Sequence, residues 1–135
     1  WNGVHLLRGS VNHRLSNLEM HNGNVGLRVD SLPVSGTAPN VILDKVLIQN
    51  FAVVGLLGYT AHIEASNLLI ANCGLYNFLG DLGGTYHFRH ATFAHLNSGF
   101  SRGFPLFAIS NRNNNGKCTN NRKCNNPKNH HALPS

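Results

Sequence analysis

The sequence has 135 residues and a hydrophobic content of 41%, which suit one domain with a buried core and exclude wholesale disorder. Charged residues make up only 12%, against roughly 25% in an average globular domain. Glycine and asparagine take their place, which favours a turn-rich β protein over a helical one. Eleven Lys and Arg residues against five acidic ones give a net charge of +6, which suits an anionic partner.

No stretch approaches the roughly 18–20 apolar residues of a membrane-spanning helix, so no transmembrane segment is predicted. The chain begins at Trp1 rather than at Met, and we take it as a mature or internal piece of a longer protein.

An internal repeat is the main feature of the chain. Its four segments are 17–22 (NLEMHN), 45–50 (KVLIQN), 67–72 (NLLIAN) and 90–95 (HATFAH), at offsets of 28, 22 and 23 residues. Apolar residues alternate within each segment, which is typical of β-strands. Recurrence at this period is typical of a solenoid that stacks parallel strands. The sequence therefore predicts an all-β solenoid of about four to five coils.

Stacking at this register places equivalent side chains in columns. The predicted inward columns are Leu15, Leu43, Ala65 and Phe88; Leu18, Val46, Leu68 and Ala91; and Met20, Ile48, Ile70 and Phe93. Glu19, Leu47, Leu69 and Thr92 form an outward column.

Asparagines close three of the four segments, at Asn22, Asn50 and Asn72, and His95 extends their column. Asparagine side chains stacked about 4.8 Å apart hydrogen-bond from coil to coil, which satisfies amides that are costly to bury alone. We predict a structural asparagine ladder at a coil corner. The alternative is that these residues are ordinary exposed turn residues.

Three regions follow from this pattern. Residues 1–110 form the coils, with 31–40 as a loop that lengthens one of them. Residues 111–131 form a polar excursion rich in Asn, Lys and Arg, and 132–135 return to a further coil.

Three motifs resemble a known group of proteins. They are W-x-G-V at 1–4, G-G-x-Y-x-F-x-H-x-T-x-A at 83–94 and S-R-x-x-P-L-x-x-I-S-N at 101–111. Together they resemble the right-handed parallel β-helix proteins of Bacteroidetes, which are surface or secreted proteins related in fold to pectate lyases. The resemblance implies a right-handed parallel β-helix, located outside the cell or on its surface in association with the outer membrane. It also implies that this chain is a fragment, because members of the group have more coils.

The acidic residues do not form a predicted catalytic site. Lyases of this fold need an acidic calcium cluster, and glycosidases need two close carboxylates. Asp44 and Glu64 fall on neighbouring coils without a third acidic partner. We predict no catalytic residue within this chain.

Histidines and cysteines give no strong metal template, and neither a metal nor a cofactor is predicted. The three-residue spacing of His87 and His90 places them on opposite faces of a strand. Cys118 and Cys124 are predicted to form a disulfide that closes a short loop, with free thiols, or zinc bound together with His130 and His131, as alternatives.

The favoured function is a secreted or cell-surface module with a binding or structural role, with polysaccharide as the favoured ligand class. Basic side chains that could contact an anionic glycan lie at Arg112, Lys117, Arg122 and Lys123. One alternative is part of a polysaccharide lyase or hydrolase whose catalytic coils lie elsewhere, and another is a subunit of an envelope protein assembly. Nucleic-acid binding is not expected, because the basic tail has no aromatic residue after Phe107.

Overall fold

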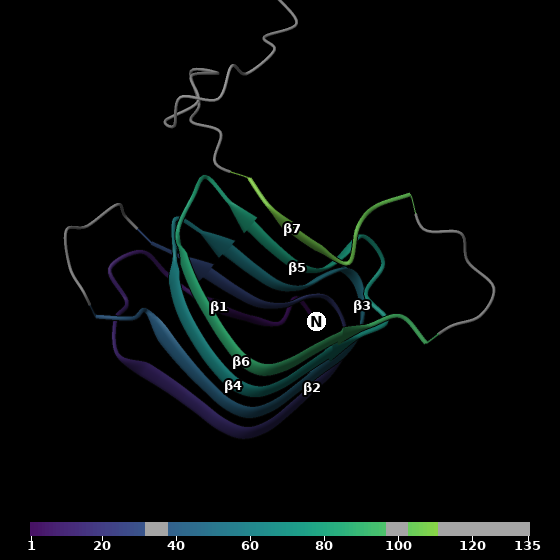
Figure 1. Ribbon diagram of the computed structural model, residues 1–135, viewed down its shortest axis with the longest axis horizontal. Coiled ribbons are helices and arrows are strands. Elements are labelled where there is room, and N and C mark those ends of the chain that lie inside the picture. Colours follow the sequence, from purple (N-terminus) through teal and green to yellow (C-terminus); the bar gives the residue numbers. More distant parts are fainter. Residues whose placement is uncertain (32–37, 97–102, 111–135) are drawn as a thin grey trace, which may run out of the picture.

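The computed structural model describes residues 1–31, 38–96 and 103–110, and every regular element in these ranges is a β-strand (Figure 1). The strands are β1 (Val4–Leu6), β2 (His13–Asp30), β3 (Val41–Tyr59), β4 (His62–Ala71), β5 (Tyr76–Asp81), β6 (Thr85–Ala94) and β7 (Phe107–Ile109). No helix in the described part of the chain has the length and apolar character needed to cross a membrane.

All strand pairs are parallel, and they join in the order β1-β2-β3-β4-β6, with β5 paired to β3 and to β7. The first part of β3 pairs with β4, and its second part pairs with β5. In Figure 1 the long strands β2 and β3 are sharply bent and nest inside one another, with β4 and β6 continuing the same stack. The prediction of an all-β protein built from parallel strands is confirmed.

The register follows the predicted columns. Met20 pairs with Ile48, Ile48 with Ile70, and Ile70 with Phe93. The column of Leu18, Val46, Leu68 and Ala91 is also reproduced, as is the column that begins at Leu15. Repeats 22–28 residues apart in the sequence therefore lie directly side by side in the sheet.

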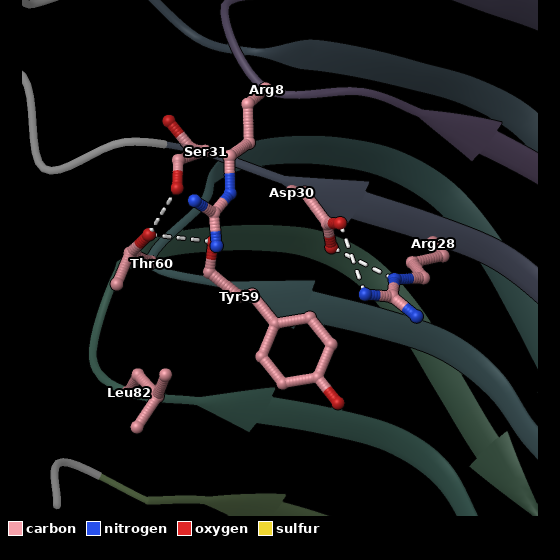
Figure 2. A pocket seen from close by; sticks show the side chains of 7 residues that line it. All are labelled: Arg8, Arg28, Asp30, Ser31, Tyr59, Thr60 and Leu82. Atoms are coloured by element: carbon pink, nitrogen blue, oxygen red, sulfur yellow. Dashed lines mark hydrogen bonds and ion pairs between the residues drawn. The ribbon is translucent and has the colours of Figure 1, made fainter. Parts of the chain in front are cut away.

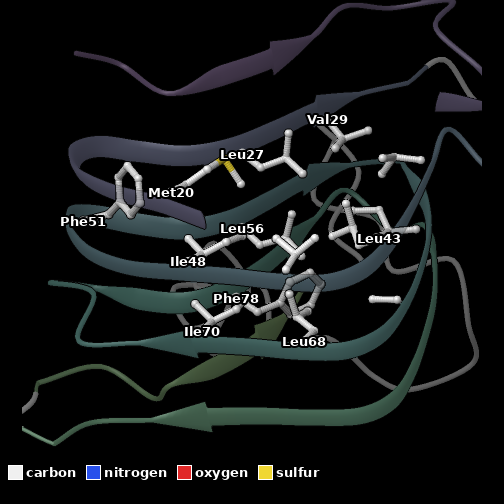
Figure 3. Packing of buried hydrophobic residues seen from close by; sticks show 14 of the residues in the cluster. Met20, Leu27, Val29, Leu43, Ile48, Phe51, Leu56, Leu68, Ile70 and Phe78 are labelled. Carbon is white, nitrogen blue, oxygen red and sulfur yellow. The ribbon is translucent and has the colours of Figure 1, made fainter. Parts of the chain in front are cut away.

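The core lies between the two arms of the bent strands, where two stacks of apolar side chains face each other (Figure 3). One stack contains Ile48 and Ile70, which are both fully buried. The other contains Leu56 and Phe78, which pair across β3 and β5 and are equally buried. Phe78 also contacts the ring of Phe107 at a centroid distance of 4.7 Å, so β7 extends the same core.

Left-handed backbone conformations recur at the bends. Asn22, Asn50 and Asn72 have φ values of 57°, 59° and 56°. A second set with the same conformation lies between the Leu15 column and the Leu18 column, at Asn17, Lys45, Asn67 and His90. Most L-residues lose roughly 1–2 kcal/mol in this conformation, whereas asparagine tolerates it. The asparagines thus recur in the sequence because the bends recur in the fold.

Of the three predicted ladder residues, Asn72 forms a side-chain hydrogen bond to the next repeat. Asn72 accepts a hydrogen bond through Oδ1 from the backbone amide of Leu96 at 2.8 Å. Asn22 and Asn50 are exposed. The amide-to-amide bonds between Asn22, Asn50 and Asn72 stay a prediction, while their shared backbone conformation is a property of the structure.

Two other asparagines are buried. Asn77 is fully buried; its Nδ2 donates to the carbonyl oxygens of Ile70 and Ala94, at 2.8 Å each. Asn40 is 4% exposed, and its Oδ1 accepts from the backbone amide of His62 at 2.7 Å. Each of these amides satisfies backbone groups on neighbouring repeats, which is what a buried polar side chain requires.

Several predicted features lie outside the described residues. These are the Cys118–Cys124 bridge, the basic residues Arg112, Lys117, Arg122 and Lys123, the excursion 111–131 and the return at 132–135. Cys73, by contrast, is a buried thiol whose Sγ lies 3.6 Å from the carbonyl oxygen of Ala71, and its burial is as expected for a small apolar side chain at this position.

Candidate functional site

A pocket of about 340 Å³ lies where β2 and β3 end (Figure 2). Asp30 is the last residue of β2 and Tyr59 is the last residue of β3, and the two pair in register. Leu82 follows β5 directly. The full lining is Arg8, Arg28, Asp30, Ser31, Tyr59, Thr60 and Leu82.

The floor of the pocket is a turn held by hydrogen bonds. Ser31 donates its backbone amide to the carbonyl oxygen of Tyr59 at 3.0 Å, and Thr60 donates its own to Asp81 at 3.0 Å. The Thr60 hydroxyl donates to the carbonyl oxygen of Ser31 at 2.7 Å. Thr60 and Leu82 both have left-handed backbones, with φ values of 49° and 58°. Thr60 and Leu82 therefore turn the chain at equivalent positions of successive repeats, and both line the pocket.

Arg28 and Asp30 form a two-pronged ion pair on one wall of the pocket. Arg28 Nε lies 2.9 Å from Asp30 Oδ1 and Nη2 lies 3.0 Å from Oδ2, while His5 Nε2 lies 2.8 Å from Oδ2. The Arg28 guanidinium also lies over the Tyr59 ring, 4.9 Å from its centroid. Two hydrogen bonds and one ring contact fix this arginine in place.

The same contacts shift the pKa values of Asp30 and Arg28. Partial burial acts to raise the pKa of Asp30, but hydrogen bonds from Arg28 and His5 outweigh it, and the net shift of the pKa is downward. The hydrogen bond to Asp30 raises the pKa of Arg28 further above its ordinary value. Both groups are therefore charged at neutral pH.

Arg8 gives the pocket an excess of positive charge. Its side chain lines the pocket, and none of the carboxylate side chains in the described part of the chain pairs with it. Arg8 and Arg28 together carry two positive charges against the single negative charge of Asp30. Figure 2 shows Arg8 directed toward the turn at Ser31 and Thr60.

Such a pocket fits a small polar ring that carries an anionic group. Its volume is at the lower end of the roughly 300–1,000 Å³ that ligand pockets occupy. The Tyr59 ring offers an apolar surface, Ser31 and Thr60 offer hydroxyls, and an arginine binds a carboxylate through two parallel hydrogen bonds.

Sequence reasoning did not single out this pocket. Its residues come from the second arm of each bent strand, where insertions change the spacing and the residue types differ between repeats. One signal was available. Extending the repeat alignment through Leu27 and Leu56 would have placed Asp30 beside Tyr59.

The predicted acidic neighbours, Asp44 and Glu64, lie on adjacent strands and two register positions apart. Asp44 pairs in register with Ser66, as expected, and accepts a hydrogen bond from Asn67 Nδ2 at 3.3 Å. Glu64 pairs in register with Ile42 on one side and with His87 on the other. In the described part of the chain, these contacts add no further acidic ligand to either residue.

The structure does bring histidines together with a carboxylate. His62 and Glu64 lie on β4 and His87 lies on β6, with one potential ligand atom of each within 4.8 Å of the others. Spacing along the sequence pairs His87 only with His90, which lies at a bend with a φ of 51°. The 23-residue repeat offset, which places His87 beside Glu64, is the signal that identifies the cluster.

Comparison with known proteins returns no match to a family model, to a curated protein or to a solved structure. What the chain does is therefore inferred from its own residues.

Proposed function

We propose that the chain is part of a right-handed parallel β-helix module, secreted or attached to the cell surface, that binds an acidic polysaccharide. Support for the β-helix comes from parallel strands in register at offsets of 22–28 residues and from left-handed bends at equivalent positions. Connections between parallel strands are right-handed in about 98% of cases, which supports that hand. The resemblance to surface β-helix proteins of Bacteroidetes agrees with this proposal.

The observation that carries the binding proposal is the pocket with its surplus arginine. Arg28 is already held by Asp30, so its charge is largely satisfied within the protein. Arg8 is exposed and has no carboxylate partner in the described residues, so it is available to a ligand. A uronic acid places a carboxylate on a ring small enough for about 340 Å³, with hydroxyls for the polar rim.

A repeat fold also suits a polymeric ligand. Stacked strands set equivalent positions about 4.8 Å apart and create an extended surface. The pocket would bind one sugar unit, and the basic residues Arg112, Lys117, Arg122 and Lys123 would contact further carboxylates along the same chain. The net charge of +6 favours this encounter at low salt.

Calorimetric titration with a short oligogalacturonate tests the proposal, with the same oligosaccharide reduced to its neutral form as the ligand control. We expect binding of the acidic ligand only, and weaker binding as salt rises. Arg8→Gln should raise the dissociation constant about tenfold or more, because a charged hydrogen bond contributes about 1.5–3 kcal/mol.

Arg14→Gln is the matched control, because Arg14 is also an exposed arginine but lies outside the pocket lining. A variant with Gln at 112, 117, 122 and 123 measures the contribution of these basic residues to binding separately from that of the pocket. Equal affinity for the acidic and neutral ligands, or equal losses in the Arg8 and Arg14 variants, would contradict the proposal. Shortening of the oligosaccharide during the titration would instead favour a lyase or hydrolase.

A further inference from the structure

We propose that His62, Glu64 and His87 form a binding site for a divalent transition-metal ion of the Zn²⁺ type. One potential ligand atom from each residue lies within 4.8 Å of the other two. Two imidazoles and one carboxylate are a ligand set that zinc uses in proteins, with water in the remaining position. The site is separate from the pocket and does not depend on glycan binding.

The strand register builds this cluster. His62 and Glu64 are two residues apart on β4, so their side chains leave the same face of the strand. His87 is the direct partner of Glu64 on β6. Two ligands from one strand and a third from its neighbour therefore converge on the outer face, and the backbone hydrogen bonds of the sheet hold all three Cα atoms in place.

The distances are close to those of a bound site. His62 Nε2 lies 3.3 Å from Glu64 Oε1, and the rings of His62 and His87 are 5.7 Å apart at a T-shaped angle of 83°. Zinc–nitrogen bonds are about 2.0–2.1 Å long, so tetrahedral ligand atoms lie about 3.3 Å apart. The His62–Glu64 pair already has this separation, and a rotation of the exposed His87 side chain brings in the third ligand.

A second observation points the same way. His62 Nε2 makes no hydrogen bond within the described residues, and the Glu64 carboxylate oxygen lies 3.3 Å from it. The backbone of the same residue is fixed by the amide of Asn40, whose Oδ1 accepts from His62 N at 2.7 Å. A metal ion between the two groups would bond both to the imidazole nitrogen and to the carboxylate oxygen.

The site is accessible from solvent and has room for further ligands. The Glu64 side chain is 42% exposed and the His62 side chain 21% exposed, while His87 is exposed. On the other side of Glu64 the strand register places Ile42, which offers no ligand atom. The three protein ligands thus lie on one side of the ion, and water completes its coordination.

Zinc titration of the 135-residue chain, followed by calorimetry and by the NMR signals of the histidine rings, tests the site. Cys118→Ser and Cys124→Ser are introduced first, because these thiols are competing ligands. We expect one equivalent of Zn²⁺ to shift the ring signals of His62 and His87. Loss of an outer-shell contact at a zinc site alone costs roughly 10–100-fold in affinity, so His87→Ala, His62→Gln and Glu64→Gln should each weaken binding at least tenfold.

His90→Asn is the matched control, because it removes a nearby histidine and places at this bend the residue found at the equivalent Asn17 and Asn67. It should leave the affinity unchanged, and circular dichroism should show that every variant keeps its β-sheet. The proposal is overturned if the His62 and His87 signals do not move with zinc. It is also overturned if His87→Ala binds zinc as tightly as His90→Asn does.

Discussion

The side-chain amide of Asn77 donates to the carbonyl oxygen of Ala94 at 2.8 Å, although the two residues are 17 positions apart. The same nitrogen donates to Ile70, and Asn77 Oδ1 accepts from the backbone amide of Cys73 at 3.3 Å. This fully buried amide therefore joins the bend after β4 to the end of β6.

Replacing Asn77 should destabilise the fold strongly. Asn77→Leu removes the partners of buried backbone groups and keeps the branched side-chain skeleton of asparagine, with bulkier methyl groups at its ends. Each unsatisfied group costs roughly 1–3 kcal/mol, so the free energy of unfolding should fall by at least that amount in a urea titration. Asn24→Leu serves as the control, because Asn24 is exposed. Equal urea midpoints for the two variants would show that the buried amide contributes little.

The left-handed bends can be tested at Asn50, which is exposed and has a φ of 59°. Asn50→Ala forces a residue with a Cβ into this conformation, whereas Asn50→Gly does not. Glycine should therefore be the more stable variant by about 1 kcal/mol, the reverse of their order in a regular strand. If alanine proves the more stable in thermal unfolding, the backbone at this bend is not left-handed.

The inward column predicts a large cavity effect at Ile70. This side chain is fully buried between Ile48 and Phe93. Ile70→Ala should lower the free energy of unfolding by about 2–5 kcal/mol, through lost burial and the cavity that remains. Leu69→Ala, at the neighbouring position that is 38% exposed, should change it far less. A similar loss in both variants would mean that the two faces of β4 are assigned wrongly.

Tyr86 gives a prediction for alkaline pH. Burial raises the pKa of Tyr86 to about 12, and its hydroxyl donates to the carbonyl oxygen of Gly83 at 2.9 Å. The folded state thus holds this proton more tightly than the unfolded state, whose tyrosine pKa is about 10. The stabilisation is complete below about pH 10 and is lost as pH rises toward 12.

Phenolate absorbance measures this directly. A phase of phenolate absorbance that appears only as the pH approaches 12 should belong to Tyr86. Tyr86→Phe should remove that late phase and reduce the loss of stability between about pH 10 and about pH 12. The idea fails if the folded protein shows no such late phase, or if the late phase survives in the variant.

The sequence predicts the first arm of each repeat well and the second arm poorly. Met20, Ile48 and Ile70 could be aligned because each sits in a short alternating segment closed by asparagine. The asparagines recur in the sequence because of the backbone bends, since few residues other than Asn and Gly tolerate a left-handed conformation. Leu56 and Phe78 pair just as closely and are each followed by Leu-Gly, but this match is short and the second arm of β2 lacks it.

The buried polar groups and the pocket were not predictable for a related reason. Asn40 and Asn77 bond mainly to backbone groups. Because every residue type has a backbone carbonyl group, such partners cannot be identified from the sequence. The pocket depends on which side chains end β2 and β3, which the alignment of the first arm does not reach.

Chemical-shift mapping with an oligogalacturonate is the most direct test of the proposed function. The account predicts that the acidic ligand shifts the backbone amides of Ser31, Thr60 and Leu82 and the ring signals of Tyr59, all of which line the pocket. The neutral reduced ligand should leave them in place, and Arg8→Gln should weaken the response about tenfold. Shifts that avoid these residues, or that persist unchanged in Arg8→Gln, would contradict it.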